Sequence, residues 1–189
     1  MSRCHHKPML LLLILSSVAV AVCVFFQCSG KISTGFHGFG VDSKENIYVG
    51  KDQKIDVYYD QQLLYSFSFN ARAYKLAIQD DLVLLAAPEQ TTYMDLYGNQ
   101  LKAIVDNGTL YRSMPQHPKE FVSSTGKHYL LKNGLIKSTI LCEEDGTVLY
   151  TTPLPEQIMQ LVFPISIIVF ISAVASCVLV LQKNQRDSQ

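Results

Sequence analysis

The chain has 189 residues and no net charge, because sixteen Lys and Arg residues balance sixteen Asp and Glu residues. This balance excludes the strongly basic surface that nucleic-acid-binding proteins present to phosphate groups. Hydrophobic residues make up 48% of the sequence, and many of them gather in two uncharged stretches, one toward each end.

The first stretch, Met9–Phe26, contains no charged residue. As a helix it would be about 27 Å long, close to the roughly 30 Å thickness of the hydrocarbon core of a bilayer, so it predicts a membrane span. Small residues after it, Cys28 and Gly30, also fit the cleavage site of a signal peptide. Because the run is longer than a usual signal core, and bulky Phe25 and Phe26 precede that site, we expect a retained anchor.

A glycine-rich segment, "GFHGFG" (35–40), follows the first stretch. Phosphate-binding glycine loops lead into a helix, and no helical pattern follows here, so we do not expect a nucleotide site. A flexible joint between the membrane and the next domain is the interpretation we favour.

Strand signals dominate from Phe36 to Thr152, and Gly-Asn, Asn-Gly or Asp-Gly pairs fall between several of the strands. The predicted strands are 46–50, 54–59, 63–69, 74–78, 82–87, 91–97, 100–105, 109–112, 120–124, 128–132, 135–142 and 147–152.

The strands form three similar units. "FGVDSKENIYVG", "LAIQDDLVLLAA" and "FVSSTGKHYLLK" start at Phe39, Leu76 and Phe121, and each leads to an outer hairpin: 57–67, 94–104 or 140–152. Each unit would have an apolar face that only a neighbouring unit can bury. Within them, "GVDSKENIYVG" and "EEDGTVLY" loosely resemble strand phrases of quinoprotein-like or NHL-like β-propeller blades.

The expected fold class is therefore mainly β, with antiparallel blade-like units flanked by two transmembrane helices. Closed propellers usually have four to eight blades. Three units would instead form an open stack, a compact sandwich or barrel, or part of a ring that other copies complete. Generic antiparallel β structure with chance similarity between hairpins is the competing interpretation.

The second uncharged stretch, Ile158–Leu181, would be about 36 Å long as a helix, so it would need tilt or a bend at Pro164. So long an apolar run is rare in the core of a soluble domain. Short tails with basic residues, 1–8 and 182–189, predict that both ends are cytoplasmic. The domain between them, 27–157, is then extracytoplasmic, and the protein belongs in the cell membrane.

The sequence contains none of the common hydrolase, zinc-protease or phosphate-loop motifs, so we predict no catalytic, cofactor-binding or metal-binding residue. The adjacent Cys4, His5 and His6 are a weak metal motif in a short tail. A disulfide between Cys28 and Cys142, the only two cysteines in the predicted outer segment, is left open.

Three hypotheses about function remain, one of which is a fragmentary or lineage-specific propeller with a purely architectural role. The leading hypothesis is a non-enzymatic binding, sensory or scaffolding module, an accessory subunit of a membrane complex, whose ligand is unknown. Its spans would contact lipid and a membrane-protein partner through small residues four apart: Ser17/Ala21, Ala19/Cys23, Ser172/Ser176 and Ala173/Cys177. The alternative is an anchored hydrolase, if folding gathers the carboxylates of Asp80, Asp81, Glu89, Glu143 and Glu144. Abundant tyrosine hints at a contact surface, although tyrosine is also a common strand residue.

Overall fold

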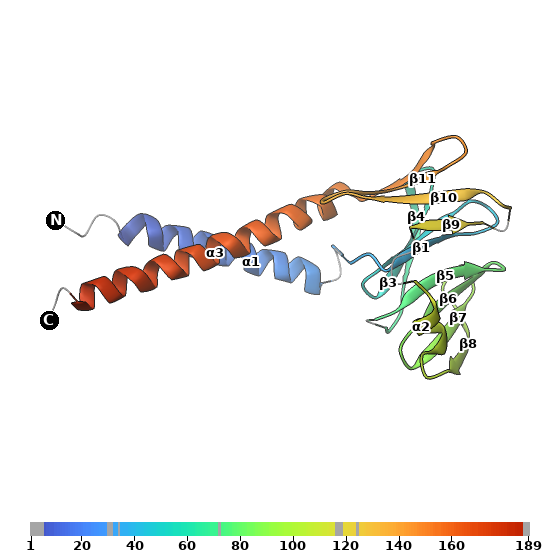
Figure 1. The fold of residues 1–189 in the computed structure, drawn as a ribbon, viewed down its shortest axis with the longest axis horizontal. Coiled ribbons are helices and arrows are strands. Elements are labelled where there is room, and N and C mark those ends of the chain that lie inside the picture. The colour runs from blue at the N-terminus through green and yellow to red at the C-terminus, as the bar shows by residue number, and fades with distance from the viewer. Residues whose placement is uncertain are drawn as a thin grey trace. The chain divides into compact units, whose positions relative to one another are not determined.

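The computed structural model describes residues 6–29, 32–33, 35–71, 73–115, 119–123 and 125–186. The chain divides into two units. One is a helical unit built from the two ends of the chain, and the other is a β domain, 33–153. Figure 1 shows the long helices and the sheets of these two units.

The helical unit contains α1 (His6–Cys28) and α3 (Leu154–Arg186), which pack against each other as an antiparallel pair (Figure 1). Both helices extend beyond the predicted spans, 9–26 and 158–181. Pro164 lies inside α3. The windows Leu11–Cys28 and Leu154–Val180 are each long and apolar enough to cross a membrane, and only 11% of each window is buried.

Small residues line the contact between the two helices. Ser16 and Cys23 are the buried residues described on α1, seven positions apart. On α3, Met159, Ser166 and Ala173 are buried with the same spacing. A seven-residue repeat keeps one face of each helix turned toward its partner, and small side chains there let the backbones approach. Cys23 and Ala173, from the predicted small-residue faces, therefore lie in this contact.

The described residues of the β domain form three four-stranded antiparallel sheets, each a simple meander of consecutive strands. Sheet A is β1 (Gly38–Val41), β2 (Ile47–Lys51), β3 (Lys54–Tyr59) and β4 (Gln62–Ser68). Sheet B is β5 (Lys75–Gln79), β6 (Leu82–Ala86), β7 (Gln90–Met94) and β8 (Gln100–Val105). Sheet C is β9 (Glu120–Val122), β10 (His128–Asn133), β11 (Ser138–Cys142) and β12 (Val148–Thr151). The predicted unit starts, Phe39, Leu76 and Phe121, all fall in the first strand of a sheet.

A bulge at the same place in each sheet shows that the units repeat. Between the third and fourth strands the register slips by one residue, which leaves one residue of the fourth strand without a partner. The extra residue is Leu64 in sheet A, Leu101 in sheet B and Leu149 in sheet C. A bulge bends and twists its strand. Three equivalent leucine bulges confirm the repeated unit and disfavour a chance similarity between hairpins.

Sheet A lies between the other two sheets. One core cluster joins it to sheet C, with Phe39, Val49 and Tyr58 meeting Tyr129 and Tyr150. The other joins its opposite face to sheet B, where Tyr48 and Ile55 are among the residues that meet Leu76, Leu85 and Met94. Most core side chains are almost fully buried, and each cluster supplies the apolar partner that a single sheet lacks.

Two predictions about local structure were wrong. Residues 109–112 form no strand, because α2 (Thr109–Ser113) begins there after Asn107 and Gly108, both at positive φ. The carboxylate of Asp106 accepts hydrogen bonds from the backbone N–H groups of Gly108 and Leu110 and favours a helical turn over a hairpin.

The glycine-rich segment 35–40 is also not a loose joint. Its second half belongs to β1, the edge strand of sheet A that contacts β5. A Cβ atom on Gly40 would lie 2.5 Å from Cγ1 of Ile78, so glycine allows β1 to approach β5 closely. His37 is fixed as well, since its Nε2 lies 3.0 Å from Oδ1 of Asp52 and its ring stacks on Tyr74.

Candidate functional site

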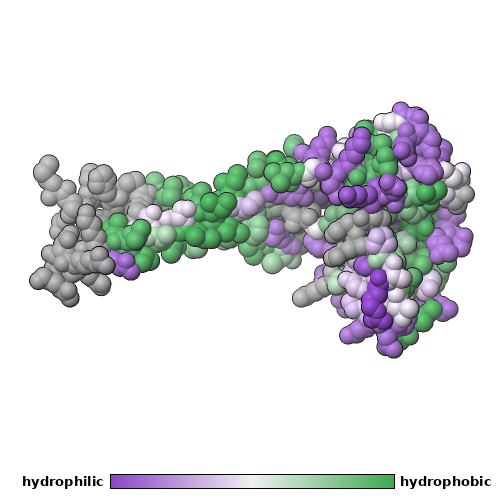
Figure 2. Space-filling model, in the orientation of Figure 1, coloured by the Kyte–Doolittle hydropathy of each residue, from purple (hydrophilic) through white to green (hydrophobic). Residues whose placement is uncertain are grey.

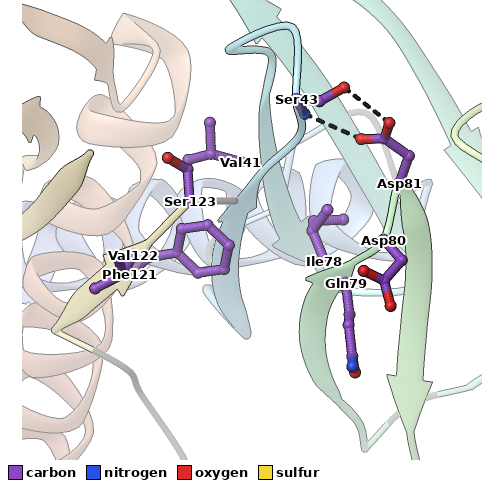
Figure 3. Close-up of a pocket in the computed structure, with 9 residues that line it drawn as sticks. All are labelled: Val41, Ser43, Ile78, Gln79, Asp80, Asp81, Phe121, Val122 and Ser123. Atoms are coloured by element: carbon purple, nitrogen blue, oxygen red, sulfur yellow. Dashed lines mark hydrogen bonds between the residues drawn. The ribbon is translucent and has the colours of Figure 1, made fainter. Parts of the chain in front are cut away.

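All three sheets contribute to one pocket, at the end of the β domain where their first hairpins turn (Figure 3). The pocket encloses about 220 Å³. Its lining comprises Val41 and Ser43 from sheet A, Ile78, Gln79, Asp80 and Asp81 from sheet B, and Phe121, Val122 and Ser123 from sheet C. We call it the hairpin pocket.

The acidic wall of the hairpin pocket is the β5–β6 turn. Asp80 and Asp81 have φ values of 50° and 56°, as a two-residue hairpin turn of type I′ requires. The carboxylate of Asp81 accepts hydrogen bonds from the backbone N–H of Ser43 at 3.0 Å and from its hydroxyl at 2.7 Å (Figure 3). These two bonds lower the pKa of Asp81, which therefore stays ionised and joins sheet B to sheet A.

The third turn is joined to sheet A by an ion pair. The ammonium group of Lys127, in the β9–β10 turn, contacts the carboxylate of Glu45 in the β1–β2 turn. This contact raises the pKa of Lys127. The β1–β2 turn is thus joined to both neighbouring turns, and the two links hold the three first hairpins around the pocket.

The walls of the pocket differ in chemistry. The Asp80 carboxylate has no hydrogen-bond or ion-pair partner among the described residues, and Figure 3 shows it beside Gln79. On the opposite side lie Phe121 and Val122, and Val122 is 54% exposed. A pocket lined by both an exposed carboxylate and apolar side chains suits a group that combines a donor or a positive charge with an apolar stem.

The candidate carboxylates of the hydrolase hypothesis do not meet in this pocket. Asp80 and Asp81 line it, whereas Glu89, Glu143 and Glu144 do not. Glu144 instead accepts hydrogen bonds from the backbone N–H of His128 and from the thiol of Cys142. Within the described part of the chain, no group of three or more His, Cys, Asp or Glu side chains could hold a metal ion.

The remaining sequence candidates are placed as follows. Cys28 and Cys142 are free thiols, so the structure has no disulfide between them. Cys4 and His5, from the tail motif, lie outside the described residues. Half of the ten tyrosines (Tyr48, Tyr58, Tyr74, Tyr129 and Tyr150) are at least 95% buried, as expected of core strand residues.

Sequence reasoning singled out Asp80 and Asp81 but missed Ser43, Phe121 and Ser123 as their neighbours. A signal was available, because all three hairpins were aligned at their turns: "DSKEN", "QDDL" and "SSTGK" stand at matching places in the three units. Equivalent turns of packed repeats lie at the same end of the stack.

No protein-family model and no curated protein matches this chain. Among solved structures, hydrazine synthase from Kuenenia stuttgartiensis is 8% identical, with a TM-score of 0.36 over 63% of this chain and 36% of its own. A catalytically inactive virginiamycin B lyase from Staphylococcus aureus is 14% identical, with a TM-score of 0.31 over 64% and 42%. A β-propeller domain from Myceliophteria thermophila is 10% identical, with a TM-score of 0.32 over 62% and 41%.

The chain thus spans less than half the length of each of these three structures. The four-stranded antiparallel sheets with equivalent bulges match the blade-like units that the sequence predicts, and no specific family is indicated.

Proposed function

We propose that this protein crosses a membrane twice and holds its β domain outside the cytoplasm as a non-enzymatic binding module, an accessory subunit of a membrane complex. The observation that supports this most is the exposure of the two long helices. Large apolar side chains such as Leu15, Val18, Ile168 and Ile171 are about half exposed or more. Figure 2 shows hydrophobic residues over much of the visible surface of the helices, whereas the β domain shows mostly hydrophilic ones.

Water does not favour such a surface, and lipid does. A soluble core helix would bury these side chains, but nine-tenths of each window stays unburied in this structure. No Asp, Glu, Lys or Arg lies in residues 9–26 or 158–181, so the predicted spans offer no acidic or basic side chain for ion or proton transport.

The proposed binding face is the hairpin pocket, with its partner a protein segment that presents a basic side chain on an apolar stem. Asp80 would receive the positive charge, and Val122 with Phe121 would contact the stem. Burial of an unpaired cation is costly, and the Asp80 carboxylate would supply the opposite charge. The pocket should therefore prefer a basic side chain to a neutral or acidic one.

A labelling experiment tests the topology. A cysteine replacing exposed Asn133 should react with a membrane-impermeant maleimide in intact cells, relative to the parent chain. A cysteine placed in the tail 182–189 should react only after permeabilisation. Protection of Asn133→Cys in intact cells would refute the orientation. Mass measurement of the mature chain checks the anchor, since a start near Lys31 would mean that the first span is removed.

Affinity purification in a mild detergent tests the partner. The parent chain should recover a membrane protein, and Val122→Lys or Asp80→Lys should reduce that recovery several-fold. Leu135→Lys is the control, because Leu135 is 96% exposed and lies outside the hairpin pocket. Recovery of the chain alone, or equal recovery by all variants, would count against an accessory role for this pocket.

A further inference from the structure

A second, larger hollow lies between sheets A and B and has a different chemistry. It encloses about 370 Å³, within the range of small-molecule sites. Its lining comprises Ser68, Phe69, Asn70 and Ala71 after β4, and Leu85, Ala87, Gln90, Thr92, Met94, Gly98 and Gln100 from sheet B. We call it the amide groove, and none of the described residues that line it is charged.

The strand register explains why these side chains meet. Gln90, Thr92 and Met94 alternate along β7 and therefore share one face of sheet B. Leu85 on β6 is paired with Thr92, and Gln100 on β8 is paired with Met94. Leu85 and Met94 belong to the core cluster between sheets A and B, so the groove is the part of that interface that the core leaves open.

Thr92 gives the strongest indication of a ligand. Its side chain is only 9% exposed, and its hydroxyl has no hydrogen-bond partner among the described residues. Every fully enclosed polar side-chain atom in the described structure has a hydrogen-bond partner. Because the Thr92 hydroxyl has none, it must be accessible, and it opens to the groove that Thr92 lines. The hydroxyl is therefore available to a ligand in the groove, whose hydrogen bond to it would replace one to water.

Three amide side chains line the same groove as this hydroxyl. Asn70, Gln90 and Gln100 are exposed, and none makes a side-chain hydrogen bond within the described chain. An amide offers donors and an acceptor without net charge, and a hydroxyl also does both. Phe69, Leu85 and Met94 add an apolar surface.

We propose that the amide groove binds a neutral saccharide unit. A sugar ring carries hydroxyl groups that donate and accept along its rim, and C–H groups that suit an apolar floor. A charged ligand would lose its hydration without gaining a counter-charge. An extended peptide would follow the open edge of a strand, whereas these polar groups come from three separate segments and face a compact ligand.

The test uses the full chain, purified in a detergent without a sugar headgroup so that the detergent does not compete. Titration calorimetry measures binding of glucose, galactose, mannose, N-acetylglucosamine, maltose, cellobiose and chitobiose. The comparison ligands are glucuronate, glucosamine and a capped Asn-Gln peptide. Saturable binding of at least one neutral sugar is expected, with the charged sugars and the peptide much weaker.

Thr92→Val replaces the hydroxyl by a methyl group of similar size and should weaken binding by roughly threefold to tenfold, the effect of one hydrogen bond. Gln100→Leu should act in the same direction. Thr151→Val is the matched control on β12, away from the groove, and should bind as the parent does. Near-UV circular dichroism verifies that each variant folds.

Three results would overturn the proposal: no neutral sugar binds, Thr92→Val binds as tightly as the parent, or the charged sugars or the peptide bind at least as well. None of these outcomes depends on the membrane topology or on the hairpin pocket.

Discussion

The two units of this protein use apolar residues in opposite ways. In the helical unit, Leu15, Ile168 and Ile171 face outward, and the small residues Ser16, Cys23 and Ala173 are buried. In the β domain the large side chains, such as Tyr48, Tyr129 and Ile140, are inside. Composition alone does not distinguish these arrangements. The two arrangements differ in the direction in which the large apolar side chains point. Outward-facing apolar side chains suit contact with lipid, and inward-facing ones suit contact with water.

Polar groups inside the two units differ as well. Ser16 and Ser17 satisfy their hydroxyls locally, on the carbonyl of Leu13. The β domain instead buries an ion pair, with Lys51 Nζ 3.0 Å from Oδ2 of Asp56 and both side chains at most 3% exposed. A buried charge is costly without a partner of opposite charge. Removing one member of this pair should therefore destabilise the β domain more than any other change considered below.

The largest expected effect is that of Asp56→Ala. It leaves the ammonium of Lys51 buried without its carboxylate and should lower the free energy of unfolding by about 3–5 kcal/mol. Urea unfolding of the full chain in micelles, followed by near-UV circular dichroism, measures this. Glu89→Ala, at an exposed turn, should change it little. Equal effects of the two variants would show that the ion pair does not stabilise the domain.

The same carboxylate predicts a pH dependence. Burial raises the pKa of Asp56, but the Ser66 hydroxyl, Lys51 and Lys54 outweigh it, and the net shift is below the usual value of 3.8. The ionised form thus stabilises the fold above that value, and this contribution is lost as the pH falls through the lowered pKa. Unfolding free energies between about pH 5 and pH 2 should fall with acid in the parent, and fall less in Asp56→Asn.

A smaller effect is expected in the β7–β8 turn. Gly98 has a φ of 89°, and a Cβ atom there would lie 2.4 Å from the ring of Phe67. Gly98→Ala should therefore cost about 2–4 kcal/mol, from backbone strain and overpacking together. Gly146 has a φ of 69°, and a Cβ atom there would meet no described atom within 4 Å. Gly146→Ala should therefore show the effect of backbone strain alone, a loss of about 1–2 kcal/mol in the free energy of unfolding. Thermal unfolding of the two variants compares them.

The smallest effect concerns the helix pair. Ala173 is 2% exposed, so Ala173→Leu should push the helices apart, whereas Ala175→Leu, on an exposed face, should not. The readout is the rate at which a membrane-permeant maleimide modifies the buried Cys23, with exposed Cys28 as the internal reference. Several-fold faster labelling of Cys23 in Ala173→Leu alone is expected. No difference between the variants would mean that these small residues do not hold the pair.

The sequence predicted the architecture well where one pattern dominated. Strands 54–59 and 100–105 have the predicted bounds, because alternating side chains lie between clear turns. The prediction failed at 109–112, since Asn107-Gly108 looks like a hairpin turn, whereas the Asp106 carboxylate accepts hydrogen bonds from the backbone N–H groups of Gly108 and Leu110 and favours a helical turn. It also missed β1, whose glycines carry little strand propensity but allow close packing on β5.

The candidate sites were less predictable, for a physical reason. Asp80 and Asp81 are neighbours in sequence, and their turn was identified. Their partners Ser43 and Ser123 come from other repeats, so only the alignment of the three units, and no local pattern, indicates that these turns lie at the same end. The amide groove depends on the same kind of information, because Thr92 is an ordinary strand residue until the segment after β4 leaves a space above it.

The pairing of α1 with α3 has a consequence for how the β domain folds. Because the helices are antiparallel, the end of α1 and the start of α3 lie at the same end of the pair (Figure 1). Residues 33–153 are then a loop closed at both ends even before any strand forms. Closure removes chain entropy from the unfolded ensemble, as a crosslink would. Cleaving the chain between α1 and β1 should thus weaken the sheets without removing a single strand contact.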